Sequence, residues 1–287
     1  MIKLQTPVEE VRSRIDMGYD DRILVVGSCF ADNIGTKLKN AAFDVCVNPF
    51  GTLYNPVSIC NSLQRLASGI PFGPSDCVPM GAGAGLICSF SHHTSFARAD
   101  EASFLEYANA SLEQAVDFYK RCNKVIVTLG TAWCYRFNEN GETVSNCLKR
   151  PAAEFSRYRL SVQETQLLLD LMVKRNPDKE FIFTVSPVRH LKDGAHGNRL
   201  SKATLLLALD GTLASNPART DYFPAYEILD DELRDYRFYA EDMLHPSEVA
   251  VSYLWERFKS FCIPESEKEK LLENEKLFRR SQHRSLH

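Results

Sequence analysis

Short apolar runs rich in β-branched residues recur along the chain, and segments with helical spacing separate them. The clearest runs are residues 23–26, 124–129 and 181–185, and a weaker one covers 43–47. Runs of this kind, bounded by Gly, Asn or Pro, are typical of strands buried on both faces of a parallel sheet. Parallel neighbours need crossover connections, so this alternation constrains the fold more than any other feature.

The intervening segments carry apolar residues three and four positions apart, which predicts helices. They are residues 31–42, 57–66, 104–119, 160–175, 201–213 and 246–261. Asn55-Pro56 is expected to begin the second helix, and Pro246 is expected in the first turn of the last. A fifth strand is expected over residues 221–228. The order predicts an α/β fold of three layers, α/β/α, with a flavodoxin-like parallel sheet of about five strands.

Two insertions are expected to decorate this core. Residues 69–85 are rich in Gly and Pro and predict a long loop. Asn140-Gly141 predicts the turn of a β-ribbon. We expect a single domain over residues 1–287, with its core at about 20–262 and a helical tail at 263–287.

The tail carries charges of alternating sign between residues 265 and 284, which favours a solvated helix over a partner-binding one. Leu271, Leu272 and Leu277 are expected to form one docking stripe.

Composition excludes several classes of protein. A net charge of −3, with no basic stripe, argues against nucleic-acid partners. No apolar run reaches the roughly 20 residues of a membrane span, and the polar N-terminal stretch predicts no signal peptide. The nine cysteines are scattered without a CxxC pair, so we expect reduced thiols, a cytoplasmic protein and no metal site. The absence of GxGxxG and GxxxxGK[ST] predicts no nucleotide cofactor.

Candidate chemistry is sought where strands end, because sites in open parallel sheets lie at the carboxyl ends of the strands. Ser28 follows the first strand directly, after Gly27. A serine at a strand-to-helix turn can act as a nucleophile, and its backbone N–H can contribute to an oxyanion hole. From this motif alone, a plain helix N-cap is an equally good interpretation.

The other strand ends carry weaker signals. Gly51 follows the second strand, Thr131 and Trp133 follow residues 124–129, and His190 with Asn198 follows residues 181–185. Taken singly, each is better explained as a turn, cap or core residue than as part of a site.

Asp242 and His245 stand three residues apart near the end of the chain, before the last predicted helix. An imidazole there could accept the proton of Ser28 while the carboxylate orients its other nitrogen. The pattern is weak alone and gains specificity from its pairing with a strand-end serine.

Together these residues resemble the SGNH hydrolase superfamily and, more closely, the GSCFA family. The resemblance rests on GSCFADNIG at 27–35, NPFGTLYNP at 48–56, VTLGTAW at 127–133, SPVRH at 186–190, NRLSK at 198–202 and EDMLHPS at 241–247. It implies Ser28 as nucleophile, Asp242 and His245 as its catalytic partners, and the N–H groups of Ser28 and Gly51 in the oxyanion hole.

One block departs from the superfamily pattern. Where that pattern has Gly-x-Asn-Asp, with the Asn side chain as an oxyanion donor, this chain has Gly130 followed by Ala132 at the Asn position. Thr131 and Asn198 are the replacement donors we name first. Loss of one such donor typically lowers the rate by roughly a hundred- to a thousandfold.

Adjacent His92 and His93 are poor joint metal ligands, because neighbouring side chains on a strand point to opposite faces. A surface or hydrogen-bonded pair is the simpler interpretation. One histidine of the pair could still reach the pocket, so the candidates for substrate binding are His93, Trp133 and His190.

The expected function is a serine esterase that removes a small acyl group, such as acetyl, from a carbohydrate or similar small alcohol. Transfer of the same acyl group to a sugar hydroxyl is one alternative. A non-catalytic carbohydrate- or partner-binding protein on a hydrolase fold is another, favoured by Ala132 and opposed by the presence of Ser28, Asp242 and His245.

Overall fold

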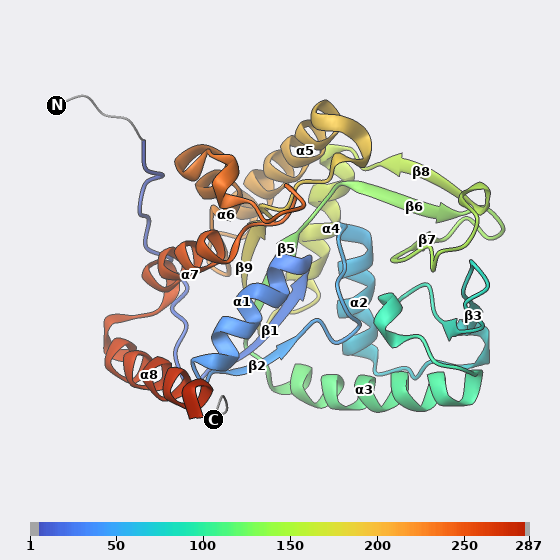
Figure 1. The fold of residues 1–287 in the computed structure, drawn as a ribbon, viewed down its shortest axis with the longest axis horizontal. Coiled ribbons are helices and arrows are strands. Elements are labelled where there is room, and N and C mark those ends of the chain that lie inside the picture. Colours follow the sequence, from blue (N-terminus) through green and yellow to red (C-terminus); the bar gives the residue numbers. More distant parts are fainter. Residues whose placement is uncertain (1–5, 285–287) are drawn as a thin grey trace.

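A five-stranded parallel sheet forms the centre of the computed structural model, which describes residues 6–284 (Figure 1). Residues 1–5 and 285–287, the ends of the predicted domain and tail, lie outside the described residues. The strand order is β10-β9-β5-β1-β2. The strands are β1 (Arg22–Gly27), β2 (Asp44–Val47), β5 (Lys124–Leu129), β9 (Glu180–Val185) and β10 (Thr220–Tyr222). The predicted flavodoxin-like sheet is confirmed.

The strand order reverses at β1, which pairs with β2 on one side and β5 on the other. Its last residue, Gly27, stands opposite Thr128 of β5. In doubly wound sheets, ligands bind in the crevice at this point of reversal, because the loops leave the two neighbouring strands toward opposite faces. The chain therefore turns from β1 into Ser28 at the place where the topology opens a crevice.

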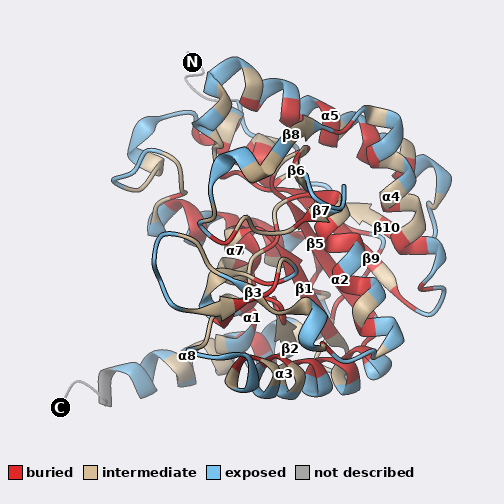
Figure 2. Cartoon of the chain, turned by 90° about the vertical axis from the view of Figure 1, so that its right-hand side faces the viewer, coloured by how far each residue is buried: buried red, intermediate tan, exposed pale blue. Residues whose placement is uncertain are grey.

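Helices cover both faces of the sheet, which confirms the three-layer α/β/α architecture (Figure 1). One face packs against α1 (Cys29–Asn40), α7 (Glu248–Cys262) and α8 (Lys268–Arg284). The other packs against α2 (Pro56–Ser68), α3 (Glu101–Arg121), α4 (Val162–Lys174) and α5 (Gly194–Ser215). Figure 2 shows the central strands buried between helices whose outer surfaces are exposed.

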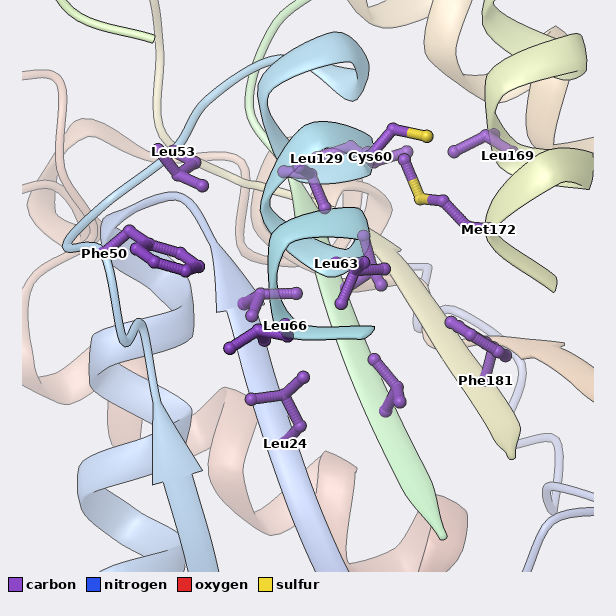
Figure 3. Close-up of a cluster of buried hydrophobic side chains, with 14 of the residues drawn as sticks. Leu24, Phe50, Leu53, Cys60, Leu63, Leu66, Leu129, Leu169, Met172 and Phe181 are labelled. Carbon is purple, nitrogen blue, oxygen red and sulfur yellow. The ribbon is translucent and has the colours of Figure 1, made fainter. Parts of the chain in front are cut away.

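The larger hydrophobic core lies between the sheet and α2 and α4 (Figure 3). Leu63 and Leu66 of α2 point toward the strands, and Met172 of α4 packs beside them. All three are at most 2% exposed. Burying side chains of this size stabilises the fold by about 1.5–3 kcal/mol each, so α2 is fixed firmly beside the sheet.

Local signals explain where some helices begin. Asn55 caps α2 by accepting a 2.9 Å hydrogen bond from Ser58 N, and Pro56 is the first helical residue, as predicted. Pro246 does not begin the last helix, and that prediction was wrong. Ser247 caps α7, whereas Pro246 pairs with Tyr239 in an isolated β-bridge outside the helix.

The predicted ribbon is a three-stranded antiparallel sheet that extends sideways from the end of β5 (Figure 1). It consists of β6 (Trp133–Phe137), β7 (Thr143–Val144) and β8 (Phe155–Arg159). Asn140-Gly141 forms the predicted turn. The Gly- and Pro-rich loop contains one short strand, β3 (Val78–Pro79), which pairs with β4 (Ile87–Cys88).

Two other expectations are corrected. The fifth strand ends at Tyr222 and does not reach residue 228, because the chain continues into α6 (Ala225–Glu227) and a π-helical turn, Ile228–Leu233. In the tail, only Leu271 is buried, whereas Leu272 and Leu277 are 51% and 53% exposed. The docking stripe is therefore a single leucine. Within residues 6–284, every helix is too short or too polar to span a bilayer.

Candidate active site

Ser28 lies at the junction between β1 and α1 and is the N-cap of the helix. Its Oγ accepts a hydrogen bond of 3.3 Å from Phe30 N, and the residue is 1% exposed. The capping role therefore holds. This capping role does not exclude a catalytic role, because the hydroxyl can give up the hydrogen bond from Phe30 N when it turns to another partner.

Gly27 allows the chain to pass unusually close to the neighbouring strand. Its φ is +134°, and a Cβ at this position would lie 2.1 Å from the carbonyl oxygen of Thr128. Ser28 N donates to that carbonyl (3.1 Å) and to Thr128 Oγ1 (2.9 Å). Ser28 Oγ lies 3.1 Å from the same hydroxyl. Thr128 was not predicted from the sequence, because only the register of β1 against β5 brings it beside Ser28.

His245 and Asp242 form a hydrogen-bonded pair. His245 Nδ1 lies 2.6 Å from Asp242 Oδ2, while Asp242 Oδ1 accepts hydrogen bonds from Leu244 N (2.9 Å) and His245 N (3.0 Å). These bonds, that from His245 N above all, lower the pKa of Asp242 to about 2. Asp242 is therefore a carboxylate, and it fixes the imidazole with the other ring nitrogen free.

The turn that carries this pair is held by hydrogen bonds at both of its ends. Ala240 N donates to the carbonyl of His245 (2.8 Å). Arg189 donates from its guanidinium to the carbonyl of Met243 (3.1 Å), and Arg189 N donates to the carbonyl of Leu244 (3.0 Å). The loop after β9 thus supports the loop that presents the histidine.

Ser28 and His245 border the same cavity, whose volume is about 380 Å³. Among the hydrogen bonds of residues 6–284, none joins their side chains directly, since Ser28 Oγ faces Thr128. The cavity is lined by Ser28, Cys29, Tyr54, Asn55, Thr131, Trp133, Tyr135, Val144, Ser145, Arg157, Val188, Arg189, His190, Leu191, Lys192, Leu244 and His245.

The candidate oxyanion donors fall in different places. Thr131 lines the cavity, but its N–H donates to the carbonyl of Tyr54 (2.9 Å). Gly51 and Asn198 lie outside the lining. Gly51 N donates to the carbonyl of Asn48 (2.7 Å), which leaves no free N–H for an oxyanion. Asn198 instead helps to position a cavity residue, because its Oδ1 accepts a hydrogen bond from His190 N (2.9 Å).

Two of the three candidate substrate-binding residues border the cavity. They are His190 and Trp133, whose buried Nε1 has no hydrogen-bond partner among the described residues. His93 does not border it. It packs behind Gly51, and its Nδ1 lies 3.0 Å from Ser95 Oγ. Its position is that of a structural residue.

His190 is the most buried ionisable group that faces the cavity. Its Nε2 is buried, and no group within residues 6–284 forms a hydrogen bond with it. Burial, followed by the positive charges of Lys202 and Arg157 and by His245, lowers the pKa of His190 to about 3. The imidazole is therefore neutral near pH 7.

Lys202 is a buried residue near the site that was not predicted from the sequence. Its Nζ donates hydrogen bonds of 2.7 Å to the carbonyls of Gly130 and Ser186, at the ends of β5 and β9. Burial lowers the pKa of Lys202 to about 7. The lysine therefore links the chain just after β5 to the chain just after β9.

The cavity lining carries positive charge. Arg157, Arg189 and Lys192 border it, and none of its described lining residues is an Asp or Glu. Arg157 is paired with Asp193, with 2.5 Å between Nη2 and Oδ2. Arg189 and Lys192 make no ion pair within residues 6–284, so their charges are uncompensated. The same residues contain no cluster of His, Cys, Asp or Glu that could hold a metal ion.

Comparison with known proteins gives one finding. The family model described as "GSCFA family" matches residues 22–258, a span that begins with β1 and ends within α7. A search of the curated proteins finds no match. The matched span contains Ser28, Asp242, His245 and the whole lining of the cavity. The chain belongs to the GSCFA family.

Proposed function

We propose that the protein is a serine esterase of the SGNH type, which hydrolyses a small acyl ester of a carbohydrate or similar alcohol. The observation that carries this proposal is the Asp242–His245 pair, whose imidazole borders the same cavity as Ser28. A nucleophile, a base and a carboxylate that orients the base are the groups that acyl transfer requires. Ser28 follows the carboxyl end of the first strand, and the Asp242–His245 pair follows the last strand. This order also supports the link to SGNH hydrolases.

In the proposed reaction, His245 Nε2 takes the proton of Ser28 as Oγ attacks the ester carbonyl. The tetrahedral intermediate collapses to an acyl-enzyme, and the imidazolium of His245 gives its proton to the leaving alcohol. Water then attacks the acyl-enzyme with His245 again as base, and the products are the free acid and restored Ser28. Asp242 stabilises the imidazolium at each step without accepting the proton.

The Ser28 hydroxyl has to turn for this chemistry. Its Oγ lies 3.1 Å from Thr128 Oγ1, and a rotation about χ1 carries it toward the cavity that His245 borders. Catalytic hydrogen bonds are often long or absent without substrate and tighten once it binds. The contact with Thr128 is a resting position in this account.

The cavity supports a small polar substrate. Its volume of about 380 Å³ is near the lower end for small-molecule sites, which are roughly 300–1,000 Å³. Aromatic side chains from the ribbon, Trp133 and Tyr135, border it together with the polar groups of Asn55 and Ser145. Aromatic rings beside hydrogen-bonding groups suit a sugar ring, which has apolar C–H faces and hydroxyl edges.

Hydrolysis is favoured over transfer of the acyl group to another alcohol. The side chains of His245 and Asp242 are 43% and 45% exposed, so water reaches the base freely. An efficient acyltransferase has to exclude water from its acyl-enzyme. A non-catalytic binding protein is disfavoured because it gains nothing from an aligned carboxylate–histidine pair.

A fluorophosphonate probe tests the proposal, since it reacts with activated serines. We expect one covalent adduct, located by peptide mass spectrometry on the peptide that contains Ser28. The Ser28→Ala protein should not react, and His245→Ala should react far more slowly. A folded wild-type protein that stays unlabelled, or an adduct on a different serine, would contradict the proposal.

A further inference from the structure

His190 lies beside the proposed nucleophile, across a glycine. A Cβ at Gly130 would lie 3.4 Å from Ser28 Cβ and 3.3 Å from His190 Nε2. Both atoms are therefore close neighbours of Gly130. His190 is one of the residues that border the cavity, and its Nε2 is buried behind that surface. It is the ring nitrogen closest to Gly130 and therefore the one turned toward the reacting centre.

The backbone N–H groups near Ser28 are already engaged. Gly130 N and Thr131 N both donate to the carbonyl of Tyr54, at 2.8 and 2.9 Å. Ser28 N donates to Thr128. A tetrahedral oxyanion needs preorganised donors, and the side-chain amide that would serve is replaced by the methyl group of Ala132.

His190 Nε2 is a buried polar atom without a partner among the described residues. Such atoms are rare in native proteins, because leaving them without a hydrogen bond costs free energy. An unpartnered polar atom that faces a cavity is satisfied when a ligand supplies the partner. An oxygen atom of a substrate bound beside Ser28 would be such a partner, since Ser28 Cβ and His190 Nε2 both lie close to Gly130.

We propose that the Nε2–H group of His190 is the hydrogen-bond donor that stabilises the oxyanion, in place of the amide absent at Ala132. The proposal rests on the proposed esterase function. His190 acts in its neutral form and donates a hydrogen bond to the carbonyl oxygen as that oxygen gains negative charge. No proton is transferred from the ring, and no covalent bond to it forms or breaks.

A role as general base does not suit His190. A base becomes an imidazolium ion, and the charges around His190 disfavour that ion. Lys202 and Arg157 both lower the pKa of His190, and no carboxylate appears among the groups that shift it. His245 has the opposite surroundings, since Asp242 is hydrogen-bonded to its ring. His245 thus serves as the base, and His190 serves as a neutral hydrogen-bond donor.

A backbone hydrogen bond and a contact with an aromatic ring hold His190 in place. His190 N donates to Asn198 Oδ1 (2.9 Å), and the ring lies edge-on to Tyr54, with 5.9 Å between centroids. Lys202 fixes the carbonyl of Gly130 beside it. A donor that is positioned before the substrate binds needs no reorganisation in the transition state.

Two variants of His190 and one matched control test the proposal with p-nitrophenyl acetate. His190→Ala should lower kcat roughly a hundred- to a thousandfold, with KM changed only slightly. His190→Gln keeps an N–H close to the position of Nε2 and should recover at least part of that loss. His196→Ala, which removes an exposed histidine on α5, should behave as wild type.

A thionoester of the same alcohol separates oxyanion stabilisation from other roles. Sulfur accepts hydrogen bonds weakly, so the wild type should hydrolyse the oxoester much faster than the thionoester. His190→Ala should lose most of this preference, because it lacks the group that donates a hydrogen bond to the oxygen. A loss of activity through misfolding or substrate misplacement would lower both rates together and leave their ratio unchanged.

Two results would overturn the assignment of His190. One is a kcat for His190→Ala within about threefold of the wild-type value. The other is a loss of rate with an unchanged oxoester-to-thionoester ratio. If the wild type itself shows no activity that depends on Ser28, the proposed function fails first. A failure of the His190 proposal is thus distinguishable from a failure of the esterase proposal.

Discussion

His245 Nδ1 lies 2.6 Å from Asp242 Oδ2 in a turn that closes on itself just before α7. The two residues are only three positions apart, so the backbone brings them together without help from the rest of the fold. Asp242 Oδ1 also accepts the N–H of His245, which fixes the carboxylate relative to the ring. The rest of the fold has only to bring this preformed pair to Ser28.

Asp242→Asn should remove the orienting charge while preserving the shape of the side chain. We expect kcat for p-nitrophenyl acetate to fall by about 10²–10⁴-fold, because the imidazolium loses its stabilising partner. Glu241→Gln, which neutralises the neighbouring exposed carboxylate, is the matched control and should stay near the wild-type rate. Equal rates for Asp242→Asn and the wild type would show that His245 works without its partner.

Gly27→Ala should destabilise the protein. The added methyl group would lie 2.1 Å from the carbonyl oxygen of Thr128, and φ is +134°. We expect the free energy of unfolding, measured in urea, to fall by at least about 2 kcal/mol. Gly73→Ala should change it by less than about 0.5 kcal/mol, because nothing lies within 4 Å of the added methyl group. Equal stabilities of the two variants would contradict the close approach of β1 and β5.

His92 predicts a specific pH dependence of stability. It is fully buried among four phenylalanine rings, with Nδ1 2.6 Å from Ser89 Oγ. Burial, and then the charge of Arg65, lowers the pKa of His92 from its ordinary value near 6.5 to about 3. Below about pH 6.5 the unfolded chain binds a proton that the folded protein does not bind. The contribution of His92 to stability should therefore fall by about 1.4 kcal/mol per pH unit as the pH decreases toward 3, in addition to the contribution of His190.

Urea unfolding near pH 7 and near pH 5 tests this prediction. His92→Gln should lose less stability between the two conditions than the wild type, even if it is less stable overall. His196→Gln, an exposed control, should keep the wild-type dependence. The prediction would be wrong if His92→Gln and wild type lost the same free energy on acidification.

Lys192 and Arg189 predict a preference for esters that carry a negative charge. Both border the cavity without an ion pair among the described residues, and the lining holds no carboxylate. An acyl ester with a carboxylate on its alcohol should have a lower KM than its neutral analogue, by a factor that shrinks with added salt. Lys192→Met should raise KM for the charged ester and leave the neutral one nearly unchanged. A preference for neutral esters in the wild type would contradict this.

The sequence predicts the fold well, because the periodic patterns that define it are local. Residues 124–129 coincide with β5, and Asn55-Pro56 begins α2 as predicted. Errors arise where tertiary contacts compete with local signals. Pro246 suits a helical first turn, yet its pairing with Tyr239 keeps it outside α7. The apolar residues after Tyr222 predict more strand, whereas the chain continues into α6 and the π-helical turn Ile228–Leu233.

The candidate site was predictable where its residues follow strand ends, as Ser28 does, or stand close in sequence, as Asp242 and His245 do. Thr128 and Lys202 were not predictable, since their partners lie on other strands and only the sheet register brings them together. Gly51 shows the opposite error. A resemblance placed its N–H in the oxyanion hole, whereas that N–H is bonded to the carbonyl of Asn48.

The most direct test of the central claim is the hydrolysis of p-nitrophenyl acetate by wild type, Ser28→Ala and the exposed control Ser252→Ala, across pH. The account predicts turnover by wild type and control that disappears in Ser28→Ala. That turnover should decline at acid pH, because the proposed mechanism requires a neutral imidazole as its base. Asp242 and His190, whose pKa values are about 2 and about 3, keep their charge states through that decline. Equal activity in wild type and Ser28→Ala would contradict the assignment of Ser28 as the nucleophile.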